Sequence, residues 1–152
     1  MGGYLVVNAA GRPFEFHCTA PVKPSKAQEI LYGPTLKPYL CGEQIGQALL
    51  SKAKTEPLLV FTDQTTTLCL REFISVPVVL VDVNHYGDVG EASLHSFTLG
   101  KLHAAIENRF SSDHPLVFDH WQTHGQSLDL TEPFSRIRSA LEEAQKSTRP
   151  AA

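Results

Sequence analysis

The chain of 152 residues is long enough to bury a core of its own, and its 42% hydrophobic and 19% charged residues are globular values. Its net charge of −3 and its scattered Lys and Arg residues argue against nucleic-acid binding, which needs clustered basic side chains. The sequence carries neither an apolar run long enough to span a bilayer nor a signal-peptide pattern. We therefore expect a soluble cytoplasmic protein with no nucleic-acid and no membrane partner.

The three cysteines, Cys18, Cys41 and Cys69, are odd in number and widely spaced. This spacing indicates neither a disulfide framework nor a zinc-ribbon site, so we expect free thiols. Cys18 lies beside His17, but adjacent strand residues point to opposite faces, so His17 is poorly placed to activate it.

The N-terminal segment predicts a β-hairpin followed by a helix. Residues 4–8 form an apolar strand and residues 9–12 a turn. Residues 14–18 alternate, and we expect the face with the two phenylalanines to be buried. After a Pro-rich break, Ser25 is the expected N-cap of a helix that runs to Tyr32.

The middle of the chain predicts a second helix and a group of strands. Pro38 suits the first turn of a helix that runs to about residue 54. Residues 57–62 read as a strand, and residues 67–71 as a strand that returns after a polar turn. The β-branched run at 76–83 predicts a central strand.

The last third predicts helices at both ends with strands between them. Four apolar residues at helical spacing predict an amphipathic helix over 98–110. Residues 116–118 and 127–130 are the expected strands. Thr131 is the expected cap of a final helix.

Together these elements predict one α+β domain over residues 1–147. In it a mainly antiparallel sheet packs with three or four helices, and the fold starts with a β-hairpin and then a helix. Residues 148–152 are expected to form a flexible tail.

The leading functional prediction is a non-enzymatic protein-interaction or assembly module. Tyr32, Leu36 and Tyr39 lie around a Gly-Pro helix break and cannot all be buried on one regular face. Exposed tyrosines are typical of interface anchors, so we expect these residues to bind another protein or a second copy of the chain. This reading needs no cofactor. The competing interpretation is that two short helices fold over the sheet and bury all three residues in the core.

A metal-dependent hydrolase is the first alternative. His114, Asp119, His120 and His124 are the candidate ligands, within residues 113–124. His120 and His124 are four apart, a spacing that binds zinc when both lie on one helix face. Gly125 and the strand expected before it argue against a helix there, so solvent-exposed loop histidines are the competing reading.

A small-ligand sensor is the second alternative. Asp82, Asn84, His85 and Asp88 follow the expected central strand, where polar side chains often form ligand sites. Their spacing departs from a calcium-binding loop, and no Gly-rich phosphate loop follows a strand. The sequence thus leaves open whether the protein is an enzyme.

Overall fold

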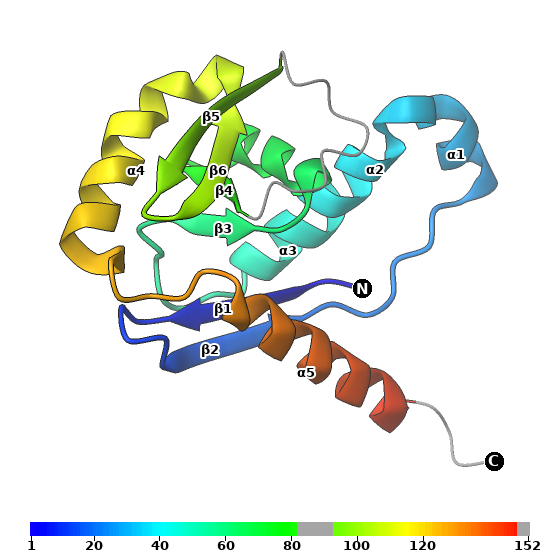
Figure 1. Cartoon of the computed structure of the whole chain (residues 1–152). Coiled ribbons are helices and arrows are strands. Elements are labelled where there is room, and N and C mark those ends of the chain that lie inside the picture. Colours follow the sequence, from blue (N-terminus) through cyan, green and yellow to red (C-terminus); the bar gives the residue numbers. More distant parts are fainter. Residues whose placement is uncertain (82–92, 149–152) are drawn as a thin grey trace.

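A β-hairpin opens the chain in the computed structural model, which describes residues 1–81 and 93–148 (Figure 1). Strands β1 (Gly3–Val7) and β2 (Pro13–Cys18) pair antiparallel, as predicted. In the turn, the side chain of Asn8 accepts hydrogen bonds from two backbone amides, each at 3.0 Å. Gly11 has a φ of 74°, which glycine adopts without strain.

The prediction for the two faces of β2 is wrong. Phe14 and Phe16 are 61% and 38% exposed, whereas Glu15 and His17 are half-buried. The reason is a tertiary hydrogen bond: the Glu15 carboxylate accepts from the amide of Lys54 at 2.9 Å. The polar face of the strand is therefore the face anchored to the rest of the protein.

Helix α1 (Lys26–Tyr32) begins where the sequence predicts. The Ser25 side chain accepts from the Gln28 amide, and the Gln28 side chain accepts from the Ser25 amide, which completes a capping box. The following helical turns form the predicted second helix, although it ends near residue 50 instead of 54. They are η1 (Gly33–Thr35), α2 (Leu36–Pro38), the π-helical η2 (Tyr39–Gly46) and α3 (Gln47–Leu50).

A second sheet forms the centre of the molecule. Its strands are β3 (Val60–Thr62), β4 (Val78–Val81), β5 (Leu94–Leu99) and β6 (Leu102–Glu107), in the order β3-β4-β6-β5. Strands β3 and β4 are parallel, and the other pairs are antiparallel. The described chain is thus a mixed α/β fold in which antiparallel pairing dominates, as predicted.

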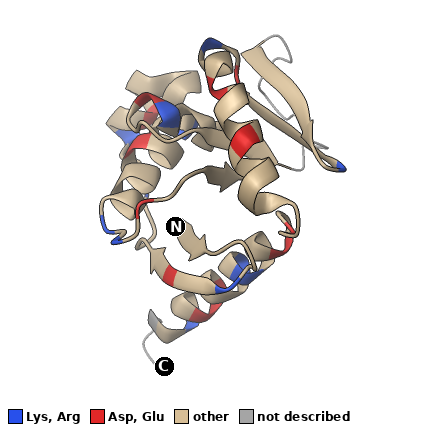
Figure 2. Ribbon diagram, turned by 90° about the vertical axis from the view of Figure 1, so that its left-hand side faces the viewer, with Lys and Arg blue, Asp and Glu red and all other residues tan. Residues whose placement is uncertain are grey.

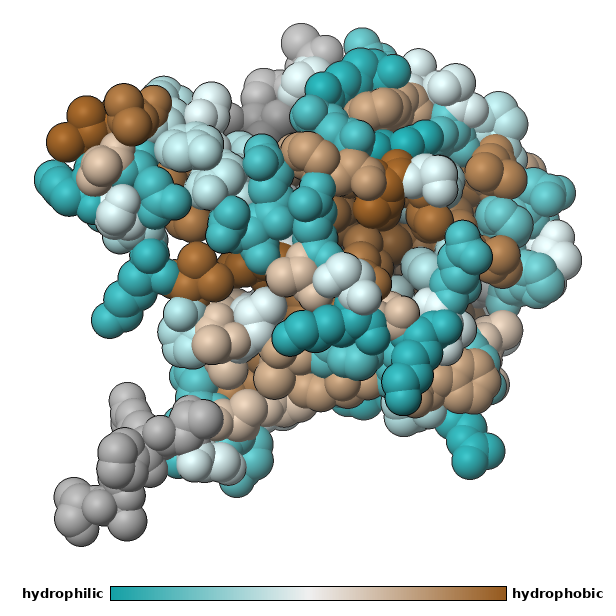
Figure 3. Space-filling model, turned by 180° about the vertical axis from the view of Figure 1, so that it is seen from behind, coloured by the Kyte–Doolittle hydropathy of each residue, from teal (hydrophilic) through white to brown (hydrophobic). Residues whose placement is uncertain are grey.

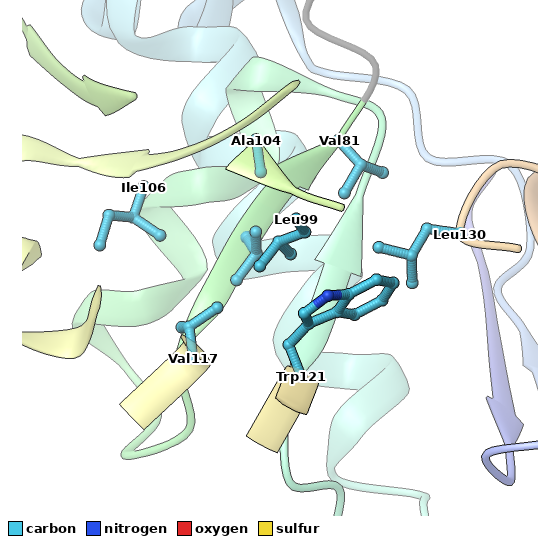
Figure 4. Close-up of a cluster of buried hydrophobic side chains, with 8 residues drawn as sticks. Val81, Leu99, Ala104, Ile106, Val117, Trp121 and Leu130 are labelled. Carbon is cyan, nitrogen blue, oxygen red and sulfur yellow. The ribbon is translucent and has the colours of Figure 1, made fainter. Parts of the chain in front are cut away.

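Both faces of this sheet are buried, which explains the continuous apolar run of β4. On one face, Val78 and Leu80 belong to a core cluster with Leu68 and Leu70. On the other face, β4 packs in the cluster that contains Trp121 (Figure 4). The sheet therefore lies between two layers of helical segments (Figure 1).

The predicted helix over 98–110 is wrong, because β5 and β6 form a hairpin there. A two-residue turn joins the strands, and Gly100 in this turn has a φ of 62°. Ala104 and Ala105 are both fully buried, one on each face of the sheet. Burial on both faces removes the alternation of polar and apolar residues that marks a half-exposed strand.

The predicted strand at 67–71 is also wrong. These residues belong to the 3-10 helix η3 (Thr65–Glu72), which covers one face of the sheet. Helix η2 packs closely on η3, because a Cβ on Gly42 would lie 2.3 Å from the Sγ of Cys69. Leu68 and Leu70 of the predicted strand are therefore core residues of a covering helix.

The two strands predicted in the last third of the chain are wrong. Residues 116–118 are helical, and residues 127–130 are irregular. Pro115 lies in the first turn of a helix, where its missing amide costs nothing. The residues from 108 on form η5 (Asn108–Asp113), α4 (His114–His120), the π-helical η6 (Trp121–Gly125) and α5 (Glu132–Thr148).

Helix α5 begins at Glu132, directly after Thr131, as the sequence predicts. The carboxylate of Asp129, instead of the Thr131 hydroxyl, accepts from the backbone amides of Thr131 and Glu132. These hydrogen bonds lower the pKa of Asp129. Among the described helices, none combines the length and the apolar character needed to cross a membrane.

We expect Gly100→Ala to destabilise the fold by about 1–2 kcal/mol, because alanine is strained at positive φ. A Cβ there would meet only ordinary contact, 3.7 Å from the Trp121 ring, so the cost is conformational. Gly100→Asn should cost less, since asparagine tolerates this conformation better. Urea unfolding measures the loss of stability in both variants, and Lys101→Ala at the neighbouring exposed position is the control. Equal stability of Gly100→Ala and the wild type would contradict the turn.

Candidate functional site

Helix α1 stands away from the central sheet at the end of an extended connection (Figure 1). We call residues 19–38 the arm. Residues 19–25 carry no regular secondary structure, and α1 has no buried residue. Helix α1 packs chiefly against the helical turns that follow it in the chain. The arm is therefore held at its two ends and not by the core.

The outward face of α1 is apolar. Ala27, Ile30 and Leu31 are spaced i, i+3, i+4, which places them on one side of the helix. All three are exposed, Ile30 at 70% and Leu31 at 82%, whereas the polar Gln28 is half-buried. Figure 3 shows this apolar surface at the upper left. We call these three residues the α1 stripe.

The predicted interaction residues Tyr32, Leu36 and Tyr39 lie together at the base of the arm. The rings of Tyr32 and Tyr39 stack with centroids 4.1 Å apart, and all three residues are half-buried. The Tyr39 hydroxyl accepts a hydrogen bond of 2.9 Å from the Gln44 side chain. These residues hold α1 against η2, while the α1 stripe, which the sequence analysis missed, faces solvent.

The histidines proposed as metal ligands separate into two places. His114 begins α4, and a 3.1 Å hydrogen bond joins its Nδ1 and the Nε2 of His95 in β5. The Phe97 ring stacks on His114 at 4.4 Å. His120 lies six residues further along the helical path, about 9 Å along its axis.

His120 and His124 do lie on a helical segment, contrary to the loop expected from the sequence. Their rings stack with centroids 6.3 Å apart. Asp119, the remaining proposed ligand, accepts a hydrogen bond from the Thr123 hydroxyl through its backbone carbonyl. In the described parts of the chain, no three or more His, Cys, Asp or Glu side chains are grouped to hold a metal ion.

The proposed ligand loop lies outside the described residues. Asp82, Asn84, His85 and Asp88 all fall between residues 81 and 93. The sensor loop therefore stays a prediction.

The ion pair between the half-buried side chains of Arg71 and Asp113 is structural. The guanidinium of Arg71 donates to Asp113 from Nε at 2.7 Å and from Nη2 at 3.2 Å, and from Nη1 to the Ile74 carbonyl. These bonds to Asp113 raise the pKa of Arg71. All three donor groups are engaged in joining η3 to η5, so the ion pair offers no open binding group.

All three cysteines are half-buried free thiols. The Cys69 thiol donates to the carbonyls of Pro38 and Thr66, at 3.2 and 3.3 Å. Burial raises the pKa of Cys69 to about 11, so this thiol is protonated at neutral pH and is no nucleophile.

An apolar cavity of about 670 Å³ lies between the N-terminal hairpin with α5 on one side and the main sheet with α3 and η6 on the other. Strands β1 and β3, which border it, carry no charged residue (Figure 2). Its lining includes Val6, Leu49, Val60, Trp121, Leu130 and Ile137. Sequence reasoning could not find this cavity, because its walls come from segments far apart in the chain.

The cavity wall also carries polar and charged side chains, among them Glu56, Asp63, His120, His124 and Arg138. The hydroxyl of Tyr4 is buried and has no hydrogen-bond partner among the described residues. Leaving such a group unpaired costs about 1–3 kcal/mol. Burial, and then the charge of Glu15, raise the pKa of Tyr4 to about 12, so it remains a hydrogen-bond donor at neutral pH.

Glu15 joins the hairpin to the connection between α3 and β3. Its carboxylate accepts from the amides of Lys54 and Thr55, from the Thr55 hydroxyl and from His17 at 2.9 Å. These hydrogen bonds, led by that of Lys54, lower the pKa of Glu15 to about 2. The side chain is therefore ionised at neutral pH and holds the hairpin over the cavity.

No protein-family model, curated protein or solved structure matches this chain.

We expect Glu15 to stabilise the fold in a pH-dependent way. Its folded-state pKa of about 2 lies below the ordinary value of 4.5. The Glu15 carboxylate therefore adds to the free energy of unfolding above pH 4.5, and this stabilisation is lost as the pH falls towards 2. Melting temperatures of wild type and Glu15→Gln should differ at pH 7 and converge across this window. The control is Glu143→Gln, at an exposed position. A difference in melting temperature between wild type and Glu15→Gln that does not change with pH would contradict the role of the ionised Glu15 in holding the hairpin.

Proposed function

We propose that this protein is a non-enzymatic protein-interaction module that docks a partner protein through helix α1. The observation that carries this proposal is the α1 stripe, an apolar face turned to solvent. Ordinary helices of globular proteins turn such a face to the core. Contiguous exposed apolar side chains mark interaction sites more often than isolated ones do.

The chemistry around the stripe suits a protein surface. Lys26 and Glu29 form an exposed ion pair of 3.0 Å on the same helix and give the stripe a charged border. An apolar centre with a polar rim is the usual composition of an interface. The Tyr32–Tyr39 stack supports this role because it sets the direction in which α1 points.

The partner that fits best is a protein with an apolar groove. Stable interfaces bury about 800 Å² on each side. Helix α1 has seven residues, and its stripe alone cannot supply that area to an identical helix of a second copy. A groove that encloses the arm on several sides can bury this much of its surface. This arrangement is the helix-in-groove mode of recognition.

The titratable groups support a non-enzymatic role. Strongly shifted pKa values tend to cluster at catalytic sites. Here Glu15, Arg71, Arg109 and Asp129 each owe their shifted pKa chiefly to hydrogen bonds that join two segments or cap a helix. Of the four ligands proposed for the metal-dependent hydrolase, His120 and His124 lie together, but the described residues add no third ligand beside them.

Photocrosslinking tests the docking surface. A benzoylphenylalanine at position 31 should give one discrete adduct in the source cells, whereas position 26 on the polar side should not. The partner identified should bind the purified protein, and Ile30→Gln with Leu31→Gln should weaken binding at least 30-fold, or about 2 kcal/mol.

The matched control is Lys26→Gln with Glu29→Gln, which changes the same helix without touching the stripe. Both double variants should keep the wild-type stability within about 0.5 kcal/mol, because all four residues are exposed. Equal crosslinking at positions 31 and 26, or unchanged affinity of the Ile30/Leu31 variant, would contradict the proposal.

A further inference from the structure

We propose that the cavity between β1 and β3 receives an extended apolar segment of a partner protein, which pairs as a strand with both of them. The cavity is half open, and every residue of both strands lines it. In this mode of recognition, called β-augmentation, main-chain hydrogen bonds supply the affinity and side-chain pockets supply the specificity. The proposal is independent of α1, because no residue of that helix lines the cavity.

One edge of β1 has no strand beside it in the described chain. The amide of Thr19 donates to the Gly2 carbonyl at 3.0 Å, which sets the alternation of hydrogen bonds between β1 and β2. In this alternation the backbone groups of Tyr4 and Val6 face β2, and those of Leu5 face the opposite way. Helix α3 packs on one face of β1 and helix α5 on the other. The remaining edge of β1 therefore borders the cavity.

The outer edge of β3 borders the same cavity. The amide of Val60 donates to the Pro77 carbonyl at 3.0 Å, so the backbone groups of Val60 face β4. Those of the next residue, Phe61, face away from β4. Within residues 1–81 and 93–148, no group forms a hydrogen bond with the backbone of Leu5 or Phe61. Buried backbone groups are normally paired, and a strand between β1 and β3 would pair both edges.

Neither edge carries the usual protection against pairing with another chain. Proteins commonly place charged residues or proline on an edge strand, and β1 and β3 contain neither. The register shift between Val6 and Val7 lies at the end of β1. With five residues, β1 spans about 17 Å. The inserted segment is therefore about five residues long, the ordinary length of a strand.

The side walls of the cavity determine which side chains fit. Side chains of a strand point alternately to its two faces. Beside β1, one face meets Ile45 and Leu49, and the opposite face meets Ile137 and Leu141. Because both walls are apolar, the inserted segment is apolar at successive positions, as the doubly buried strand β4 is.

Charged residues of the lining flank β3 in the chain. Glu56 precedes the strand and is exposed, and Asp63 follows it directly. Asp63 forms an ion pair with Arg138 of α5, which also lines the cavity. A basic residue beside the apolar segment would pair with Glu56. The partner segment that fits is therefore an apolar strand flanked by a basic residue.

The test is titration of the full chain with the peptide acetyl-Lys-Val-Val-Leu-Val-Lys-amide, whose four central residues repeat the sequence of β4. Trp121 is the single tryptophan and lines the cavity, so its fluorescence reports binding. We expect a saturable change at one peptide per chain. N-methylation of the two central residues removes one amide donor on each edge of the peptide. This methylated peptide should bind about 30-fold more weakly, the value of two hydrogen bonds.

Hydrogen exchange of single amides, followed by NMR, locates the bound peptide. The amides of Leu5 and Phe61 should exchange at least tenfold more slowly with the peptide bound, because each then donates to it. The amide of Val6 is the internal reference, since it faces β2 with or without the peptide.

The variant Ile30→Gln with Leu31→Gln is the matched control, because it changes the α1 stripe and should bind the peptide as the wild type does. Equal affinity for the methylated and unmethylated peptides would overturn the proposal and assign the cavity to apolar ligands in general. Absence of saturable binding, or unchanged exchange of Leu5 and Phe61, would overturn it too. Nuclear Overhauser contacts between Leu5 and Phe61 in the free protein would show that β1 and β3 pair directly, with the same consequence.

Discussion

Strand β1 lies between helix α3 and helix α5, and this close packing determines the arrangement of the molecule. A Cβ on Gly2, just before the strand, would lie 2.2 Å from Ile45 at the end of η2 and 3.5 Å from Leu49 of α3, and one on Gly3 would lie 2.7 Å from Ile137 of α5. Only glycine allows the backbone to approach both helices at once. The start of the chain therefore connects the C-terminal helix to the helices beside the main sheet.

Two features depend on this position of β1. Together with α5, the hairpin forms a separate layer over the main sheet, and the space left between them is the cavity. Glu15 fixes the free side of this layer through the amides of Lys54 and Thr55. The arm leaves the hairpin at residue 19, so it can present α1 to a partner without disturbing the cavity. Binding in the cavity and docking at α1 are thus physically separable.

The sequence predicts local structure well and tertiary context poorly. The opening hairpin and the Ser25 cap are confirmed, because turn and capping chemistry act within a few residues. The helix predicted over 98–110 is a hairpin, since burial of Ala104 and Ala105 on opposite faces gives no alternation. Exposure of the α1 stripe could not be predicted, because periodicity shows which residues share a face but not what covers that face.

Hydrogen exchange of the β1 amides, followed by NMR, is the most direct test of this arrangement. An isolated two-stranded hairpin is marginal in water, so its amides would exchange freely if it were not docked. We expect the β1 amides that pair with β2 to exchange nearly as slowly as those of the central strand β4. Exchange of β1 within seconds while β4 stays protected would show an undocked hairpin and contradict both the packing of β1 and the cavity.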